Sequence, residues 1–139
     1  MPFNLVSHGW NKLEPGGTDY YMNYLGKNSI CVECGQHADS KSIKRAKESI
    51  MTFLKIMGNI DDQNIEITAH KQRIVEVKYI YITKNNFTPV KNFYDFEPIK
   101  KGALIGTDGE GEITANSDGC VIFCKKYEGE SKEAFLIGE

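Results

Sequence analysis

The second half of the sequence has the pattern of short β-strands separated by glycine-containing turns, and this pattern constrains the fold more than any other feature. Valine and tyrosine occupy every second position from Val75 to Tyr81, which is typical of a strand with one buried face. Further strands are expected at residues 65–69, 93–96, 104–105, 112–115, 121–123 and 134–137. Short strands at this spacing predict a small all-β barrel or sandwich over residues 63–139.

The preceding part of the chain contains an amphipathic helix as its clearest element. Apolar residues from Ile43 to Met57 recur every three or four positions, and lysines lie largely on the opposite face. Polar residues at 39–42 can cap the start of the helix, and Gly58 can cap its end. A strand is expected just before it, at residues 29–35. Because one strand and one helix cannot enclose a core, we expect them to belong to a larger α/β sheet.

The opening residues are rich in glycine, asparagine and tyrosine and show little periodicity. Loops are expected at residues 8–11 and 14–19, followed by a short helix between Tyr20 and Gly26. The whole pattern predicts an α+β chain in two parts. These are a partial α/β segment at residues 1–62 and the small all-β module at residues 63–139.

The composition excludes several classes of partner. Lysine and arginine number 17 against 19 aspartates and glutamates, a net charge of −2, so no basic excess indicates nucleic-acid binding. No window approaches the roughly 18 apolar residues that span a bilayer. The N-terminus lacks the basic and apolar regions of a signal peptide. We therefore expect a cytoplasmic protein without nucleic-acid or membrane partners.

Four cysteines occur in two closely spaced pairs, Cys31 with Cys34 and Cys120 with Cys124. Such spacing occurs in structural zinc sites, which require a turn between the paired ligands. Both pairs instead fall in strand-like runs. Reduced, mostly buried thiols are therefore expected, and a structural metal remains the alternative.

Glu33 is the most informative single residue, because it is a carboxylate in the middle of the apolar run from Ser29 to Gly35. Burying an unpaired carboxylate costs several kcal/mol, so its side chain is either exposed or held in a site that uses it. A strand that ends at Gly35 and leads into a helix places Glu33 at a carboxyl end, where open sheets carry their chemistry. A solvent-facing glutamate on an edge strand is the alternative.

These segments, in this order, resemble the later part of the succinylglutamate desuccinylase/aspartoacylase family. The similarity covers Gly17-Thr18-Asp19-Tyr20, residues 26–35 and the helix that ends at residues 53–58. The stretches 96–106 and 113–121 are similar to the family's β module, and also to a lipoyl- or biotinyl-type fold. Family members are zinc-dependent deacylases with a carboxypeptidase-like α/β domain. Their catalytic glutamate stands in a Glu-x-Gly strand end, here Glu33 and Gly35.

The resemblance implies hydrolysis of the amide bond of an N-acyl amino acid or a similar small molecule. Zinc would polarise the amide carbonyl and acidify a bound water. Glu33 would take the proton of that water and deliver it to the departing amine.

Three further residues are candidates for substrate binding, each with a simpler structural explanation. His37 could contact a substrate carboxylate, or it could be an exposed loop histidine. Asp19 could orient a partner of Glu33, although turn formation explains it equally well. Tyr20 could line a pocket, or it could pack on the helix.

The metal ligands of the family are missing from this sequence. The family uses a His-x-x-Glu pair and a second histidine, whereas His8, His37 and His70 are followed by other residues. We therefore predict that no metal ligand lies in this chain, that an upstream metal-binding half supplies the zinc, and that this chain alone is inactive. The alternative is a stand-alone binding or regulatory module without catalysis. The sheet edge left by the missing half also favours self-association as a homodimer.

Overall fold

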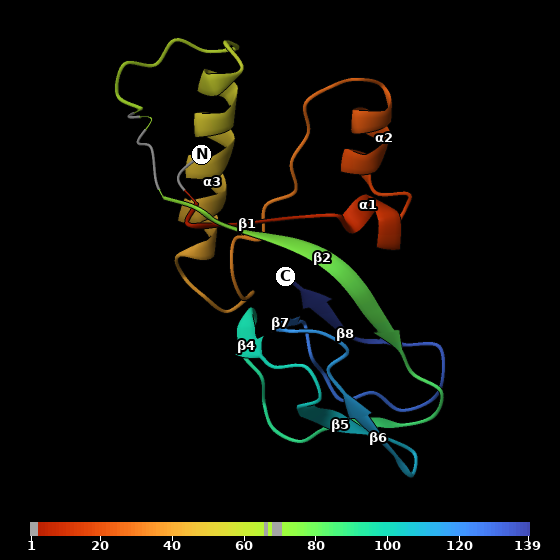
Figure 1. Ribbon diagram of the computed structural model, residues 1–139. Coiled ribbons are helices and arrows are strands. Elements are labelled where there is room, and N and C mark those ends of the chain that lie inside the picture. The colour runs from red at the N-terminus through yellow and green to blue at the C-terminus, as the bar shows by residue number, and fades with distance from the viewer. Residues whose placement is uncertain (1–2, 66, 68–70) are drawn as a thin grey trace. The chain divides into compact units, whose positions relative to one another are not determined.

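The computed structural model describes residues 3–65, 67 and 71–139. The chain divides into two compact units, which are described separately. Unit 1 comprises Met1–Val6 and Gly16–Arg73, and unit 2 comprises Ser7–Pro15 and Ile74–Glu139. The described residues contain both helices and mixed sheets, so the α+β class is confirmed (Figure 1).

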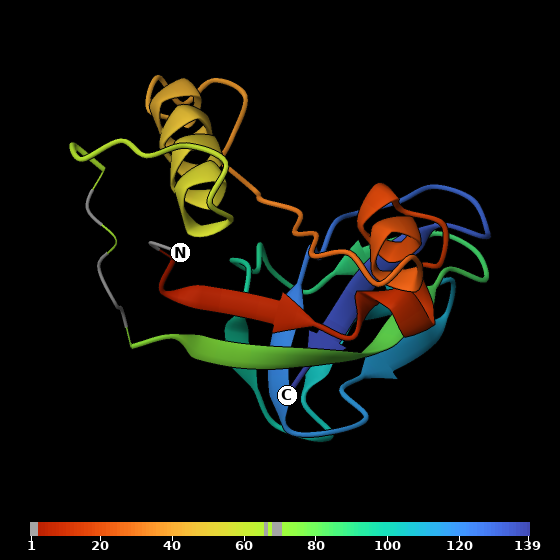
Figure 2. The same ribbon diagram turned by 90° about the horizontal axis from the view of Figure 1, so that it is seen from above.

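The strands form two sheets. The five-stranded sheet has the order β1-β2-β8-β7-β4, and the three-stranded sheet has the order β3-β5-β6. Their bounds are β1 (Leu5–His8), β2 (Arg73–Ile82), β3 (Phe87–Pro89), β4 (Glu97–Ile99), β5 (Leu104–Asp108), β6 (Gly111–Thr114), β7 (Gly119–Ile122) and β8 (Glu133–Gly138). Figure 2 shows β1 and β2 side by side. The predicted barrel is not supported, because the strand order of the described residues closes neither sheet.

Strand β8 is the centre of unit 2. It lies between β2 and β7 and pairs with both in antiparallel register. Phe135 and Ile137 pack into one apolar cluster and Leu136 into another, so both faces of the strand are buried. A strand covered on both faces has a continuous apolar sequence, and the run Ala134–Ile137 has this character.

An aromatic group forms much of the larger cluster. The ring of Phe135 stacks on Tyr81 with centroids 5.2 Å apart and lies 5.5 Å from Phe87 at a tilted angle. The hydroxyl of Tyr81 donates a hydrogen bond to the Asp108 carboxylate at 2.8 Å. Burial, followed by this hydrogen bond, raises the pKa of Tyr81 to about 12.

Several strand predictions are confirmed, and two need correction. The strand expected from the alternation between Val75 and Tyr81 is present as β2, and the later strands correspond to β5–β8. The strand expected at 93–96 is wrong, because Phe96 has a positive φ of 64° and the strand begins at Glu97. Ile65 and Ile67 lie outside any strand, while the rest of the predicted strand at 65–69 falls outside the described residues.

Gly106 lies where β5 passes close to β3. A β-carbon at this position would stand 2.6 Å from the Thr88 carbonyl oxygen and 2.7 Å from the Phe87 ring. We expect Gly106→Ala to reduce the free energy of unfolding by about 1–3 kcal/mol, since neither neighbour can withdraw freely. Gly111→Ala is the matched control, because its nearest contact would be an ordinary 3.6 Å. Urea denaturation measures both, and equal midpoints would contradict the prediction.

Unit 1 contains α2 (Thr18–Tyr24) and α3 (Ser42–Ile56), both near their predicted positions. Helix α3 is followed by Gly58 in the left-handed region, φ 72°, as expected for a helix end. Its first turn has no side-chain cap, and the Asp39 carboxylate accepts the backbone N–H of Lys41 instead. None of the helices in the described part is long and apolar enough to cross a membrane.

Two predictions in the N-terminal part are wrong. The expected loop at residues 8–11 is instead the end of β1 followed by α1 (Trp10–Leu13). Residues 29–35 form no strand, although the sequence has a strand pattern. A strand exists only where a neighbour accepts its hydrogen bonds, and no described segment pairs with these residues.

Candidate functional site

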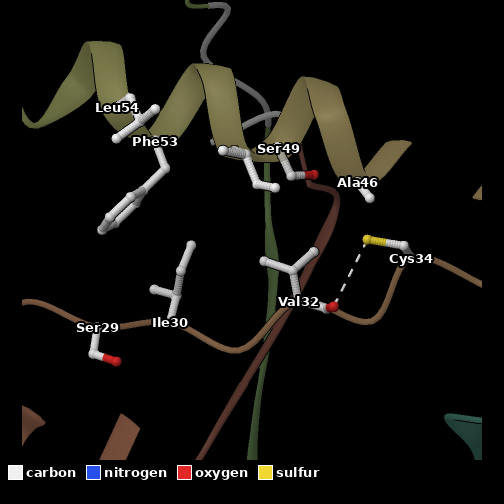
Figure 3. A pocket seen from close by; sticks show the side chains of 9 residues that line it. Ser29, Ile30, Val32, Cys34, Ala46, Ser49, Phe53 and Leu54 are labelled. Atoms are coloured by element: carbon white, nitrogen blue, oxygen red, sulfur yellow. Dashed lines mark hydrogen bonds between the residues drawn. The ribbon is translucent and has the colours of Figure 1, made fainter. Parts of the chain in front are cut away.

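The segment that carries Glu33 lies against helix α3 within unit 1. Ile30, Val32 and Cys34 line a pocket of ≈ 420 Å³ together with helix residues that include Ala46 and Phe53. Figure 3 shows Ile30 and Val32 pointing toward the helix, while the Ser29 hydroxyl lies on the other side of the segment. Every second residue from Ile30 to Cys34 therefore faces α3, which is the alternation of an extended chain.

A polar network fixes the end of this segment. Arg45 donates a hydrogen bond from Nη1 to the Cys34 carbonyl at 3.3 Å and forms a salt bridge with Asp39. The hydroxyl of Ser42 donates to the Gln36 carbonyl at 2.9 Å. These contacts hold the turn that follows Glu33 on the first turns of α3.

Gly35 is the residue that this geometry requires. Its φ of +112° lies in a region that other residues rarely adopt, and a β-carbon there would stand 2.8 Å from Arg45 Nη1. The sequence pattern places Gly35 at the end of the segment but does not indicate Arg45. The only indication in the sequence is that Asp39 lies before the helix start and Arg45 follows six residues later within the helix. This spacing is too common to identify the pair.

The carboxyl of Asp39 is stabilised in its ionised form. The backbone N–H of Lys41 and, second, the Arg45 guanidinium lower the pKa of Asp39 below its usual value of 3.8. The pKa of Asp39 is lower in the folded chain than in the unfolded chain. The ionised Asp39 carboxylate therefore stabilises the folded chain above pH 3.8. This stabilisation is lost as the pH falls through the folded pKa.

We expect an NMR titration of the Asp39 side-chain carboxyl carbon to give a pKa below 3.8. Arg45→Met should raise the pKa of Asp39 only part of the way back to 3.8, because the hydrogen bond from the Lys41 N–H lowers this pKa more than Arg45 does. Asp61 provides the control signal for a carboxylate outside this network. A pKa of Asp39 at or above 3.8 in the unmodified chain would contradict the geometry.

Glu33 itself is exposed and does not line the pocket. It follows Val32 and precedes Cys34, which both face α3, so the alternation places its side chain on the opposite side of the segment. Within the described residues, that side carries no hydrogen bond or ion pair to Glu33.

The other three predicted site residues also belong to unit 1. Asp19 is half-buried in the first turn of α2, Tyr20 is 37% exposed on the same helix, and His37 is exposed in the turn before α3. No hydrogen bond or ion pair within the described residues joins any of them to Glu33. Asp19 and Tyr20 therefore stand on α2 and His37 before α3, each on a different element from the Glu33 segment.

The metal-ligating residue types are scattered. Among the described residues, no group of three or more histidine, cysteine, aspartate or glutamate side chains could hold a metal ion. Cys31 is exposed and Cys120 is buried, where its thiol donates a hydrogen bond to the Gly138 carbonyl at 3.4 Å. Burial raises the pKa of Cys124 to about 11. His70 lies outside the described residues. In the part of the chain that the structure describes, these side chains are therefore not grouped as a zinc site requires.

Comparison with known proteins found matches at the level of structure only. No family model matches the sequence, and no curated protein matches it. A succinylglutamate desuccinylase from Silicibacter sp. TM1040 superimposes with a TM-score of 0.61 at 20% identity, over 99% of this chain and 45% of its own. The ectoine utilization protein EutE (DoeB) from Ruegeria pomeroyi matches in two structures.

The apo form of EutE gives a TM-score of 0.62 at 18% identity and covers 97% of this chain and 46% of its own. The product-bound form gives a TM-score of 0.61 at 17% identity and covers 87% of this chain and 41% of its own. At these identities the likeness shows the fold alone. The fold is similar to part of a desuccinylase fold, and this chain spans less than half the length of each of these proteins.

Proposed function

We propose that this chain is one portion of a zinc-dependent deacylase that hydrolyses the amide bond of an N-acyl amino acid. In this proposal the chain supplies the catalytic carboxylate of Glu33 and is inactive alone. The supporting observation is the fold likeness to a succinylglutamate desuccinylase, which takes in 99% of this chain but only 45% of the other. A portion of such a fold that carries an intact Glu-x-Gly segment supports a divided site.

The proposed role of Glu33 is that of a general base and then a general acid. Its carboxylate takes a proton from the water that attacks the amide carbonyl. It then gives this proton to the amine as the carbon–nitrogen bond breaks, so that an acid and a free amine leave. The exposed position of Glu33 within unit 1 leaves its carboxylate accessible to a substrate held by another polypeptide. The resemblance to the deacylase family implies zinc, which residues outside this chain would have to hold.

Asp19, Tyr20 and His37 are proposed to contribute to substrate binding. His37 is exposed in the turn after Gly35, where an imidazole N–H could donate a hydrogen bond to a substrate carboxylate. Asp19 and Tyr20 lie on α2 of the same unit, where Asp19 could accept and Tyr20 could donate a hydrogen bond.

The test uses the full chain joined to the part of the Silicibacter desuccinylase that it does not cover. We expect this chimera, supplied with zinc, to hydrolyse N-succinylglutamate and the chain alone to leave it intact. Ninhydrin detection of the released amine measures both. Hydrolysis by the chain alone would refute the divided site. Binding of N-succinylglutamate by the chain alone, with no hydrolysis by the chimera, would favour the non-catalytic binding module.

The DNA upstream of the codon for Met1 gives a second, independent check. The proposal expects an upstream or neighbouring reading frame that encodes a His-x-x-Glu motif and a further histidine. A genome with no such sequence near this gene would favour the stand-alone module.

A further inference from the structure

The backbone of the Glu33 segment is unpaired. Among the described residues, positions 28–35 make no backbone-to-backbone hydrogen bond. The flanking residues do, because the N–H of Lys27 donates to Met22 and that of Asp39 donates to Gln36. Side chains donate hydrogen bonds to two carbonyl groups of the segment. The Arg45 guanidinium donates to the Cys34 carbonyl, and the Cys34 thiol donates to the Val32 carbonyl. None of the segment's N–H groups has a backbone partner in the described part of the chain.

The side chains of the same segment are those of a strand. Isoleucine, valine and cysteine at positions 30–32 favour extended structure, and the alternate residues face α3 in Figure 3. One face therefore lies toward the helix, with Ile30 still 48% exposed, and neither hydrogen-bonding edge is paired among the described residues. An extended apolar segment with open edges is a template for pairing with another strand.

We propose that Ile30–Cys34 is an acceptor strand, which pairs through its backbone with a strand of the polypeptide that carries the rest of the deacylase fold. This inference rests on the proposed function and names the place where the two parts join. The length of the matched proteins indicates which polypeptide would pair with Ile30–Cys34. These proteins are more than twice as long as the part that this chain covers, so the remainder of such a fold is the expected partner. Strand addition would convert the unpaired N–H groups into sheet hydrogen bonds and fix Glu33 at the strand end.

A second copy of this chain is a poorer occupant. Parallel pairing of two identical segments in register would set Glu33 beside Glu33, and like charges on neighbouring strands repel. A second copy would also repeat the same 45% of the fold and leave the remainder missing.

Hydrogen–deuterium exchange measured by mass spectrometry or NMR tests the proposal without reference to activity. In the chain alone, the amides of residues 30–34 should exchange at nearly unprotected rates, while those of β8 exchange slowly. In the chimera with the Silicibacter remainder, the amides of residues 30–34 should slow by at least about 100-fold. A second chimera, built with the corresponding remainder of EutE, repeats the measurement on an independent partner.

Two variants identify the backbone as the binding element. Val32→Pro removes one N–H from the segment, so protection of the neighbouring amides in the chimera should be lost. Val32→Ala removes most of the same side chain but keeps the N–H, so protection should remain. Equal protection in both variants would show that side-chain packing, rather than strand pairing, holds the segment.

Each other outcome is also decisive. Slow exchange of residues 30–34 in the monomeric chain would overturn the proposal, because the edges would already be occupied. Protection that increases with the concentration of the chain alone would make a second copy the occupant and also overturn it. Fast exchange in both chimeras would overturn it as well. Protection without hydrolysis would leave the acceptor strand standing and defeat the proposed catalytic role of Glu33.

Discussion

Replacing Phe135 with alanine is expected to reduce the free energy of unfolding of unit 2 by about 3–5 kcal/mol. The side chain is 1% exposed on the central strand β8, and its ring packs on Tyr81, Phe87 and Tyr79. Truncation removes both the transfer free energy of the ring and its contacts with three aromatic neighbours. Because native domains are stable by only about 5–15 kcal/mol, this single change should bring unit 2 close to unfolding.

Chemical denaturation followed by tyrosine fluorescence measures this loss. Tyr94→Ala is the control, since Tyr94 is 66% exposed and its removal should change the unfolding free energy by no more than about 0.5 kcal/mol. A loss below about 1 kcal/mol for Phe135→Ala would contradict the central position assigned to β8.

Replacing Glu33 with glutamine is expected to lower the rate of amide hydrolysis by the chimera about 10²–10⁴-fold. Glutamine keeps nearly the same shape but cannot accept a proton from water at neutral pH. The loss should appear in kcat, with KM changed little, because a general base acts in the transition state more than in substrate binding. Steady-state kinetics with N-succinylglutamate separates the two parameters.

Glu48→Gln provides the matched control for this substitution. Glu48 lies on α3 of the same unit, its side chain is 57% exposed, and its ion pair with Lys44 is a surface contact. Such pairs contribute little, so hydrolysis should stay near that of the unmodified chimera. Equal rates for the Glu33→Gln and Glu48→Gln variants would remove Glu33 from the mechanism.

The elements that could be predicted are those whose signal is local. Helix α3 follows from its apolar spacing and from Gly58, which adopts the expected positive φ. Strand β2 follows from the alternation that begins at Val75. The hairpin between β5 and β6 follows from the turn at Gly109, whose φ of 62° suits glycine.

The elements that could not be predicted depend on distant parts of the chain or on another chain. Residues 29–35 have the local pattern of a strand, but no segment in the described part of the chain pairs with them. The salt bridge between Arg45 and Asp39 depends on a turn whose geometry the sequence pattern does not specify. Strand number and spacing predict a barrel or a sandwich without deciding between them. Closure depends on strand tilt and register, which appear only in the folded sheets.

A crystal structure of the chimera with bound N-succinylglutamate tests the central claim most directly. We predict that Ile30–Cys34 forms an interior strand and that the Glu33 carboxylate stands about 2.6–3.2 Å from a water positioned at the substrate amide carbon. A Glu33 side chain that faces bulk solvent, with the substrate bound elsewhere, would contradict the assignment of this chain as the carboxylate-bearing portion of a deacylase.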